Sequence, residues 1–425
     1  MKNIQVIGSG ISGLSVARMM MNSNNVEVME ASSLPGGIIK CSKEDASQAL
    51  FHRVGGHVFN SKNQEVLNWF WSHFDRQTEF LSAKRNAKIL LDSKYIGYPI
   101  ENYLYQLPAE TTKKIVSELI SGESLKKDAN DYENFKDFLI GNFGNTLYSL
   151  YFEPYNKKIW NQDLKKIPLP WLEGKLPMPN IKEIFLNNIL KGSESEMVHS
   201  TFYYPINEGS QFIVNRLSEH LNIHTNSRLE NIKFSSLGKI ILNGDISNPK
   251  DLLIYTGDIR NLHNIIEVDD LELKNALENA KKLIANGTSN VLCETDNTDL
   301  SWLYLPDSNI TAHRIIYTGN FSNNNNGILN RKTCVVEFSG FVPEEKINYD
   351  LSLLPGNLKA LDYNYEPKSY IIQDDNTRIL VSKIKKLLKK RNIYLLGRFA
   401  EWEYYNMDKC IESAMLLDSE IKLLD

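Results

Sequence analysis

The sequence predicts a mixed α/β fold with a discontinuous Rossmann-like nucleotide-binding domain, an inserted helical domain and an antiparallel β-sheet domain. Three observations lead to this prediction. Residues 4–30 read as strand, glycine turn, helix and strand, residues 105–195 are mostly helical in pattern, and residues 285–372 contain alternating strand-like runs. The domain ranges we expect are 1–95, 201–265 and 386–425 for the nucleotide-binding domain, 96–200 for the helical domain and 266–385 for the sheet domain.

The glycine turn near the start of the sequence predicts dinucleotide binding. An apolar strand runs directly into Gly8, Gly10 and Gly13, and a helix follows at once. In this motif the first glycine forms a tight turn, the second lets a pyrophosphate approach the backbone, and the third lets the helix pack against the strand. The next apolar strand ends at Glu30, which can accept hydrogen bonds from a ribose. An ordinary glycine turn of an α/β sheet is the alternative.

Later segments predict further strands of the same sheet. Apolar runs at 252–255 and 393–396 each lead into a glycine, Gly257 and Gly397, as expected of strands that return to the nucleotide-binding sheet. A last helix is expected from about Met407.

Three other segments have a simple local interpretation. The pattern predicts a helix over 63–74, with Asn60 or Ser61 as its N-cap. The polar tract Asn323–Asn326 is expected in a loop. The basic run Lys383–Arg391 is amphipathic, and we favour a solvated surface helix over membrane contact.

Composition narrows the class of protein. With 425 residues, 42% of them hydrophobic, the chain is long enough for two or three domains. A net charge of −4 gives no general attraction to nucleic acid or to an anionic membrane. The four cysteines lack metal-ligand spacing, so we expect buried thiols and no metal site. Because Gly8 belongs to the cofactor turn and no apolar stretch could span a bilayer, we expect no signal peptide and a cytoplasmic protein.

A second group of glycines extends the cofactor motif. Pro35-Gly36-Gly37 follows the ribose acid, and a late strand runs into Gly397-Arg398. This combination resembles the two-domain FAD proteins, which include amine oxidases, protoporphyrinogen oxidase and UDP-galactopyranose mutase. The resemblance implies FAD as the cofactor. The residues expected to bind it are Gly8, Gly10, Ser12, Gly13, Glu30, Gly36, Gly37, Gly56, His57, Gly257, Gly397, Arg398 and Met407.

Further segments, spread over nearly the whole chain and in the same order, narrow the resemblance to the UDP-galactopyranose mutases and their relatives. Gly55–Phe59 is similar to the family's Gly-Gly-His segment, and Tyr155–Asp163 to its Tyr-Thr-x-Lys-Gln-Trp-Gly-x-Asp stretch. Trp302–Pro306 with His313–Ile315 resembles the region that carries a diphosphate-binding arginine. Gly397–Asp408 resembles the family's C-terminal Gly-Arg-x-x-x-Tyr-x-Tyr-x-Asp-Met segment.

The resemblance implies a reaction without net redox change. Mutases of this family interconvert the six-membered and five-membered ring forms of a nucleotide-diphosphate sugar, for polysaccharide biosynthesis. N5 of the reduced flavin attacks the anomeric carbon and expels the nucleotide diphosphate, so the cofactor is the nucleophile. The expected partners are therefore the nucleotide sugar and a reductant such as NAD(P)H or a reductase. We expect no nucleic acid partner and no stable membrane insertion, and a homo-oligomer is one option.

The resemblance also implies roles for individual residues. A diphosphate is best bound by a guanidinium and several hydroxyl donors. Any single aromatic residue is, however, more often part of a core. The expected catalytic residues are His57, Arg314 and Tyr404, and the expected substrate-binding residues are Tyr155, Trp160, Lys175, Tyr370 and Asp408.

The chain departs from the family pattern at several positions. Lys175 lies in the segment where mutases carry a second arginine, and a lysine offers a point charge in place of a bidentate fork. Asn161 replaces a glycine, Trp402 a tyrosine and Asn406 an acid. Two alternatives therefore stay open. One is an FAD-dependent oxidoreductase of the amine oxidase or protoporphyrinogen oxidase type, and the other is a non-catalytic flavin-binding relative.

Overall fold

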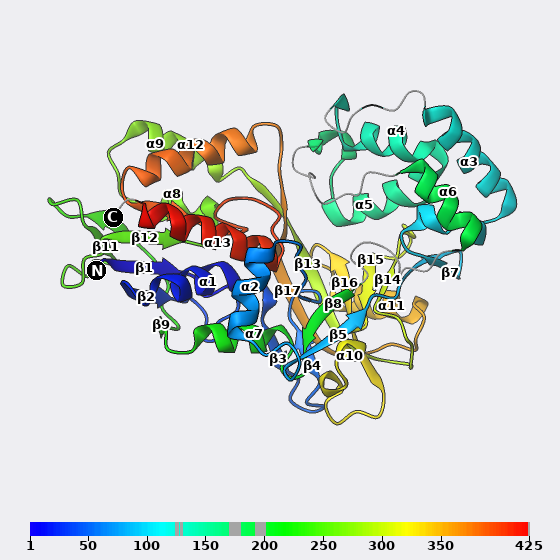
Figure 1. Cartoon of the computed structure of the whole chain (residues 1–425), viewed down its shortest axis with the longest axis horizontal. Coiled ribbons are helices and arrows are strands. Elements are labelled where there is room, and N and C mark those ends of the chain that lie inside the picture. The colour runs from blue at the N-terminus through cyan, green and yellow to red at the C-terminus, as the bar shows by residue number, and fades with distance from the viewer. Residues whose placement is uncertain (124–126, 128–130, 170–179, 192–200, 424–425) are drawn as a thin grey trace.

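The computed structural model describes residues 1–123, 127, 131–169, 180–191 and 201–423 (Figure 1). Its strands form two large sheets, of five and seven strands, and three two-stranded ribbons. The five-stranded sheet lies in the half of the molecule that holds both termini, and the seven-stranded sheet lies in the other half.

The five-stranded sheet is parallel throughout and is assembled from the beginning, the middle and the end of the chain. Parallel strands of this kind are covered by helices on both faces. The predicted returning strands are both present in it. In spatial order the strands are β18 (Ile393–Leu395), β12 (Leu252–Tyr255), β1 (Asn3–Ile7), β2 (Asn25–Met29) and β9 (Asn222–His224).

Helices cover both faces of this sheet (Figure 1). On one face, α1 (Ile11–Met20) and α13 (Met407–Lys422) share an apolar cluster with β1, β2 and β12. On the other face, α8 (Leu262–Ile265), α9 (Leu271–Ala280) and α12 (Thr377–Lys389) pack together. The basic run predicted as a surface helix is the second half of α12, whose apolar side chains point into this core.

The seven-stranded sheet is antiparallel except where β14 pairs with β6. Its five strands from the 284–372 region confirm the predicted sheet. Two strands from residues 87–97 extend it, although the predicted ranges put those residues mainly with the first sheet; the division into domains stays a prediction. In spatial order the strands are β17 (Lys359–Ile372), β13 (Ile284–Thr295), β16 (Lys332–Ser339), β15 (Ala312–Ile316), β14 (Trp302–Tyr304), β6 (Ala87–Leu91) and β7 (Lys94–Gly97).

The helical region packs on one face of this second sheet through a large aromatic cluster. Pro154 lies in the first turn of a helix, where its missing N–H costs nothing. A π-helical turn at 148–152 joins that helix to the one before it. The helices are α3 (Ala109–Glu123), α4 (Phe135–Leu147), α5 (Glu153–Trp160) and α6 (Ile181–Leu190).

The remaining elements are the ribbons and further helices, two of which share an apolar cluster with α1 and α13 of the first half. The ribbons pair β3 with β4, β5 with β8 and β10 with β11. Their bounds are β3 Cys41–Lys43, β4 Leu50–His52, β5 Phe80–Lys84, β8 Thr201–Pro205, β10 Ile232–Phe234 and β11 Ile240–Leu242, and the helices are α2 Gln64–His73, α7 Ser210–Ser218, α10 Thr318–Phe321 and α11 Glu344–Leu353.

The predicted N-cap of α2 is wrong. Asn63 caps the helix, because its side-chain oxygen accepts hydrogen bonds from the N–H groups of Glu65 and Val66 at 2.9 and 3.4 Å. Asn60 and Ser61 lie too far before the first turn to reach those N–H groups.

The asparagine tract 323–326 is also different from the prediction. It forms a 3₁₀ turn in which Asn325 and Asn326 are buried, and it is not an exposed loop. Their side-chain amides donate to the carbonyl oxygens of Thr318 and Gly319 at 2.7 and 3.0 Å. The polar side chains therefore satisfy backbone carbonyl groups of the preceding helix α10, a role that composition alone does not reveal.

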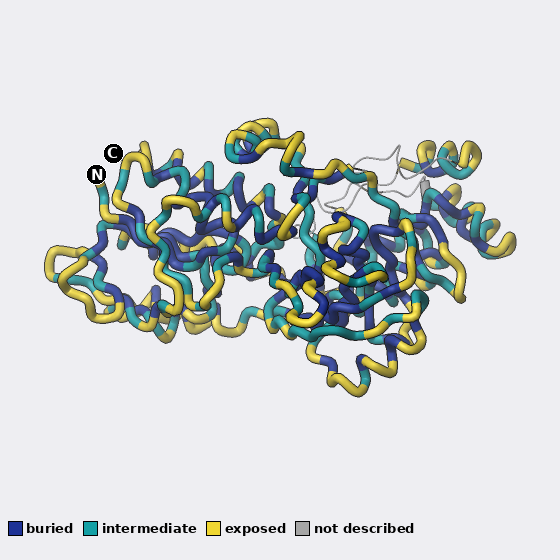
Figure 2. Tube along the Cα trace, turned by 90° about the horizontal axis from the view of Figure 1, so that it is seen from below, coloured by how far each residue is buried: buried dark blue, intermediate teal, exposed yellow. Residues whose placement is uncertain are grey.

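Within the described residues, no helix is both long and apolar enough to cross a membrane, and no cluster of three metal-binding side chains occurs. The four cysteines are buried and unpaired by disulfides. Buried residues follow the centre of both halves, with exposed residues on the outer turns and helices (Figure 2).

Candidate functional site

The two glycine turns lie against each other at the carboxyl end of β1. Gly8 has φ +97° and donates its N–H to the carbonyl oxygen of Met29 at 2.8 Å, which closes the turn onto β2. Gly36 donates to the carbonyl oxygen of Ser9 at 3.0 Å. A Cβ added to Gly37 would lie 3.2 Å from the Cα of Gly10. The two glycine turns therefore face each other with backbone atoms and no side chains between them.

The start of α1 completes this part of the site. A Cβ on Gly13 would overlap the carbonyl oxygen of Gly8, so only glycine lets α1 approach β1 this closely. A Cβ on Gly397 would overlap the Ser12 side chain, which places the late glycine at the same helix end. Gly10, the N-cap, offers no side-chain cap, and the first N–H groups of α1 are free for phosphate oxygens.

Glu30 lies directly after β2, beside the turn. Burial opposes its ionisation, but hydrogen bonds from Ser9 and Ser32 outweigh this and lower the pKa of Glu30. The backbone N–H groups of Ser9 and Ser32 donate to it at 2.9 and 2.8 Å. Glu30 is therefore a charged acceptor at the position where the motif needs one for a ribose.

The loop Gly55–His57 joins the glycine turns to the second sheet. A Cβ on Gly56 would lie 2.6 Å from the side chain of Ile316, and one on Gly55 would lie 3.3 Å from a guanidinium nitrogen of Arg314. Burial, with Arg398 nearby, lowers the pKa of His57 to about 4, so the ring is neutral. Among the described residues its Nε2 has no hydrogen-bond partner. This nitrogen is available to a bound molecule.

Arg314 is the centre of a buried charged network on the second sheet. It lies on β15 directly opposite Glu337 of β16, and its Nε donates to that carboxylate. Tyr370 of β17 accepts a hydrogen bond from Arg314 at 3.2 Å and donates one to Glu337 at 3.1 Å. Burial alone would raise the pKa of Glu337, but Arg314 and His313 hold it far below its ordinary value. The guanidinium is thus fixed in direction by an ionised acid and a hydroxyl.

An aromatic wall connects this network to the C-terminal segment. The rings of Tyr370 and Tyr404 stack with centroids 5.9 Å apart, and Trp160 meets both edge-on at 5.7 and 6.0 Å. The guanidinium of Arg398 lies 4.1 Å above the ring of Tyr404 and donates to the carbonyl oxygen of Ser369. Four predicted residues from three distant segments therefore meet here.

Tyr155 lies on the other side of Arg314. Its ring stacks on Tyr151 at 5.4 Å and meets Tyr304 edge-on at 5.4 Å. Tyr304 is the cross-strand neighbour of Arg314, and Arg85 donates to its hydroxyl. Burial raises the pKa of Tyr155 well above its ordinary value, so its hydroxyl keeps its proton.

Other predicted residues lie apart from this network. Asp408, in the first turn of α13, faces Ser61. Met407 is buried at the start of α13, and Gly257 follows β12 beside the ring of Tyr255. Lys175 lies outside the described residues.

Two departures from the family pattern have structural reasons. Asn161 ends α5 with φ +48° and ψ +38°, a left-handed conformation that asparagine tolerates better than most residues, which explains how it replaces glycine. Trp402 is fully buried and donates its Nε1–H to the carbonyl oxygen of Ile372 at 3.0 Å. Trp402 therefore belongs to the core and not to the site.

The sequence analysis missed Glu337, Tyr304, Tyr151 and Arg85. Glu337 ends the apolar run Thr333–Glu337, and an acid inside such a run was the one available signal. Arg85 and Tyr304 carry no local signal, because their contact joins residues far apart in the chain, whereas Tyr151 stacks on Tyr155, four residues later.

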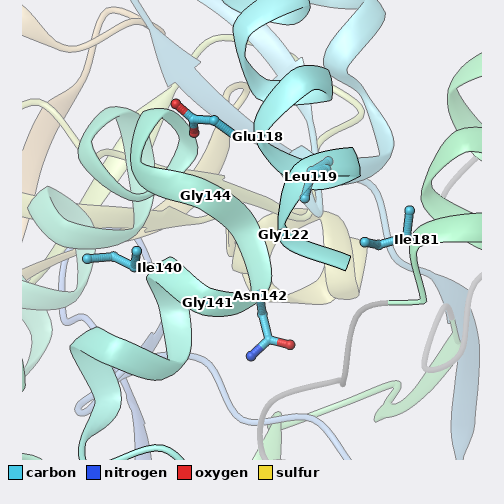
Figure 3. Close-up of a pocket in the computed structure, with 8 residues that line it drawn as sticks. All are labelled: Glu118, Leu119, Gly122, Ile140, Gly141, Asn142, Gly144 and Ile181. Carbon is cyan, nitrogen blue, oxygen red and sulfur yellow. The ribbon is translucent and has the colours of Figure 1, made fainter. Parts of the chain in front are cut away.

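Two cavities border the helical region, and the tyrosines and arginine of the Arg314 network do not line either of them. A cavity of about 30 Å³ between α3, α4 and the start of α6 holds about one water molecule (Figure 3). A more open cleft of about 560 Å³ borders α5 and the β14–β15 connection. Its lining includes Lys157, Lys158 and Thr311, but neither Tyr155 nor Trp160.

Glycine turns at the ends of parallel strands, with a charged aromatic network alongside, define a Rossmann-like nucleotide-binding protein. A family model for an NAD(P)-binding Rossmann-like domain matches residues 6–74. The chain is 24% identical to the dTDP-fucopyranose mutase of Escherichia coli, with 98% of this chain and 97% of that protein covered. It is 22% identical to the UDP-galactopyranose mutase of Mycoplasma genitalium, with 96% and 92% covered.

Solved structures give the same result for the fold. A crystal structure of reduced UDP-galactopyranose mutase matches with a TM-score of 0.85 at 21% identity, covering 100% of this chain and 94% of that one. A putative protoporphyrinogen oxidase from Exiguobacterium sp. 255-15 matches with a TM-score of 0.75 at 15% identity, covering 100% and 99%. The chain thus resembles the UDP-galactopyranose mutases, as its motifs predict, and the predicted mixed α/β fold with a Rossmann-like domain is confirmed.

Proposed function

We propose that this protein is a flavin-dependent mutase that interconverts the pyranose and furanose forms of a nucleotide-diphosphate sugar, in polysaccharide biosynthesis. The observation that carries the proposal is Arg314, fixed by Glu337 and Tyr370 and bordered by tyrosines, next to the loop that leads to the glycine turns. The names of its relatives, dTDP-fucopyranose mutase and UDP-galactopyranose mutase, support the same reaction class.

The cofactor we propose is FAD. Bare backbone at Gly10 and Gly37, free N–H groups at the start of α1 and the charged Glu30 fit a dinucleotide. The unpartnered Nε2 of His57 fits a polar edge of an isoalloxazine ring. When bound and reduced, the flavin supplies the nucleophile for the sugar. Arg398, Gly257 and Met407 complete the proposed binding set.

The network around Arg314 has the chemistry that a diphosphate requires. Its guanidinium is held in one direction, so little conformational entropy is lost when an anion binds. Burial raises the pKa of Tyr370 well above its ordinary value, so its hydroxyl, like that of Tyr155, stays a donor. Tyr404 and Trp160 close the wall and exclude water, which strengthens each hydrogen bond. We assign these residues, with Lys175 and Asp408, to substrate binding.

The oxidoreductase alternative has support from the fold alone, because a putative protoporphyrinogen oxidase shares it. An oxidase of that type would bind its substrate in an apolar pocket or an aromatic cage. Here the aromatic residues surround an arginine and an ionised acid, which favours an anionic substrate. The proposal includes a reductant for the flavin, either NAD(P)H or a reductase. It also includes a homo-oligomer as one option.

The test is anaerobic conversion. The purified protein is reduced with dithionite and incubated with UDP-galactofuranose, UDP-galactopyranose or dTDP-fucopyranose, and the products are separated by chromatography. We expect a ring-isomerised product that is absent with oxidised protein and with Arg314→Ala. Absence of conversion, with a bound and reducible flavin, would contradict the mutase, and oxygen consumption with an amine panel would then support an oxidase. The flavin is then released from the protein by heat and identified by chromatography, and we expect FAD.

A further inference from the structure

A β-bulge on β15 changes the direction of one side chain in the Arg314 network. Ala312 pairs with Phe338 and Arg314 pairs with Glu337, so His313 is an extra residue between two regular pairs. In a regular strand, neighbouring side chains point to opposite faces of the sheet. The bulge removes this alternation locally, and both His313 and Arg314 approach the same carboxylate.

His313 is a buried polar group whose contact with Glu337 is longer than a normal hydrogen bond. It is 0% exposed, and its Nε2 lies 3.6 Å from a carboxylate oxygen of Glu337. Among the described residues neither ring nitrogen has a hydrogen-bond partner. Burial lowers the pKa of His313 although Glu337 opposes this, so the ring is neutral. Buried polar groups are nearly always paired, and an exception at a site calls for a functional reason.

Charged groups from several elements surround His313. The groups that face it are Glu337 on β16, Arg314 on its own strand, Lys158 on α5 and the Tyr370 ring on β17, at 6.2 Å. Lys158 is held by the carbonyl oxygens of Leu305 and Ala312 at 2.7 and 3.1 Å, with Asp307 and Asp350 close to its charge. The Arg314–Glu337 pair is therefore neutral overall, so a dianion that binds at Arg314 brings its negative charge close to an ionised carboxylate.

We propose that His313 takes up one proton from solvent when a nucleotide-diphosphate sugar binds at Arg314, and releases it when the nucleotide sugar leaves. This inference rests on the proposed function. A diphosphate adds two negative charges beside a carboxylate that is already ionised, and a buried site with that net charge is costly. A proton on the His313 imidazole, 3.6 Å from Glu337, restores one positive charge without moving any side chain. His313 is a positioning residue, which acts on the ligand through Glu337 and Arg314.

Proton uptake on binding makes the affinity for the nucleotide sugar depend on pH. His313 is neutral in the free protein and charged in the complex, so binding raises its pKa. The complex binds one more proton, and affinity therefore increases as pH falls through the pKa of the complex. The increase is at most about tenfold per pH unit and stops below the pKa of the free protein.

Isothermal titration calorimetry tests this directly. The flavin-loaded protein is titrated with UDP-galactopyranose and with dTDP-fucopyranose near neutral pH, in two buffers that differ in ionisation enthalpy, which gives the number of protons taken up. A nucleotide sugar is the right probe because its diphosphate has no terminal phosphate group that titrates near pH 6. The variants are His313→Asn and His313→Gln. The matched control is His263→Asn on α8, whose Nδ1 contacts the carbonyl oxygen of Arg260 at 2.6 Å, away from the site.

We expect uptake of about one proton in the wild type and in His263→Asn, and none in either His313 variant. The His313 variants should bind up to about tenfold more weakly at the acidic end and equally well at the alkaline end. Binding of the wild type without proton uptake overturns the inference, even if both variants fail to fold. Uptake that persists in His313→Asn but disappears in Glu337→Gln also overturns it, because Glu337 then takes the proton. If neither nucleotide sugar binds the wild type at all, the proposed function fails instead.

Discussion

The glycine turns of the first sheet and the Arg314 network of the second are built in different ways. The turns consist of backbone, and their shape depends on side chains being absent at Gly10, Gly13 and Gly37. The Arg314 network consists of side chains from three strands and from α5, each held by another. One half of the site is defined by the missing Cβ atoms, and the other half by charges that must be paired.

This difference determines how each half can fail. A backbone turn is lost when any side chain is added, but its neighbours keep their own hydrogen bonds. A buried charge network fails when one member is removed, because the remaining partner stays buried and unpaired. Substitutions should therefore separate the two halves by their cost in folding stability and in binding.

The largest effect is expected from Arg314→Ala. Its loss leaves Glu337, which is 2% exposed, as an unpaired buried carboxylate, at a cost of about 3–5 kcal/mol in unfolding free energy. The matched control is Arg53→Ala, since Arg53 pairs at 2.9 Å with Asp362 but both side chains are about 30% exposed. Its loss should cost only about 0–1 kcal/mol. Urea unfolding measures both, and equal losses would contradict the buried-network description.

Gly13→Ala should break the backbone half. The added Cβ would overlap the carbonyl oxygen of Gly8, so α1 must move away from β1, at a cost of about 1–3 kcal/mol. Flavin content per protein after purification should fall sharply. Gly122→Ala on α3 is the control, because a Cβ there meets no atom within 4 Å. Full flavin content in Gly13→Ala would show that the turn does not need this close contact.

Tyr370→Phe removes one hydroxyl and leaves the ring in place. Arg314 and Glu337 each lose a hydrogen bond, which should weaken substrate binding by about 1.5 kcal/mol, roughly tenfold in kcat/KM. Tyr363→Phe is the matched control, because its hydroxyl bonds Asn348 at 3.0 Å on the surface. Steady-state conversion of the nucleotide sugar measures both. Unchanged kinetics in Tyr370→Phe would remove Tyr370 from the network.

The smallest effect is expected on the unfolding free energy in acid, through the protonation of Glu337. The folded-state pKa of Glu337 lies far below its ordinary value of 4.5, so its contribution is complete above that value and is lost as pH falls. Between pH 5 and pH 4 this one group should cost about 0.7 kcal/mol of unfolding free energy. Glu337→Gln should lose this part of the slope, as measured by urea unfolding at each pH. An identical slope in the variant would contradict the predicted pKa.

The two halves also differ in how far the sequence predicts them. The glycine turn is local, because strand, turn, helix and acid follow one another within 27 residues, from Ile4 to Glu30. The sequence pattern alone therefore predicts it. Arg314 was predicted because its segment, with Trp302–Pro306, resembles the mutase region that carries a diphosphate-binding arginine. Glu337 was missed, since an acid at the end of a strand ordinarily faces solvent, and only the pairing of β15 with β16 shows that it is buried.

The register of strand pairing cannot be predicted from a local sequence pattern. The bulge at His313 depends on how β15 pairs with β16, and pairing is set by the whole sheet. The burial of Asn325 and Asn326 likewise depends on packing, here against the backbone of α10. The wrong cap of α2 has a local cause, because Asn60, Ser61 and Asn63 are all suitable cap residues and lie within four positions.

The order of strands in the first sheet has a consequence for how the protein is made. β18 pairs with β12 and leads into Gly397, so the last strand to be synthesised completes a sheet whose first strand is β1. A growing chain can form the second sheet and the helical region while this edge is still missing. The hydrogen bond from Gly8 to Met29 can form early, but the late glycine reaches Ser12 at the start of α1 only after residue 397 has been translated.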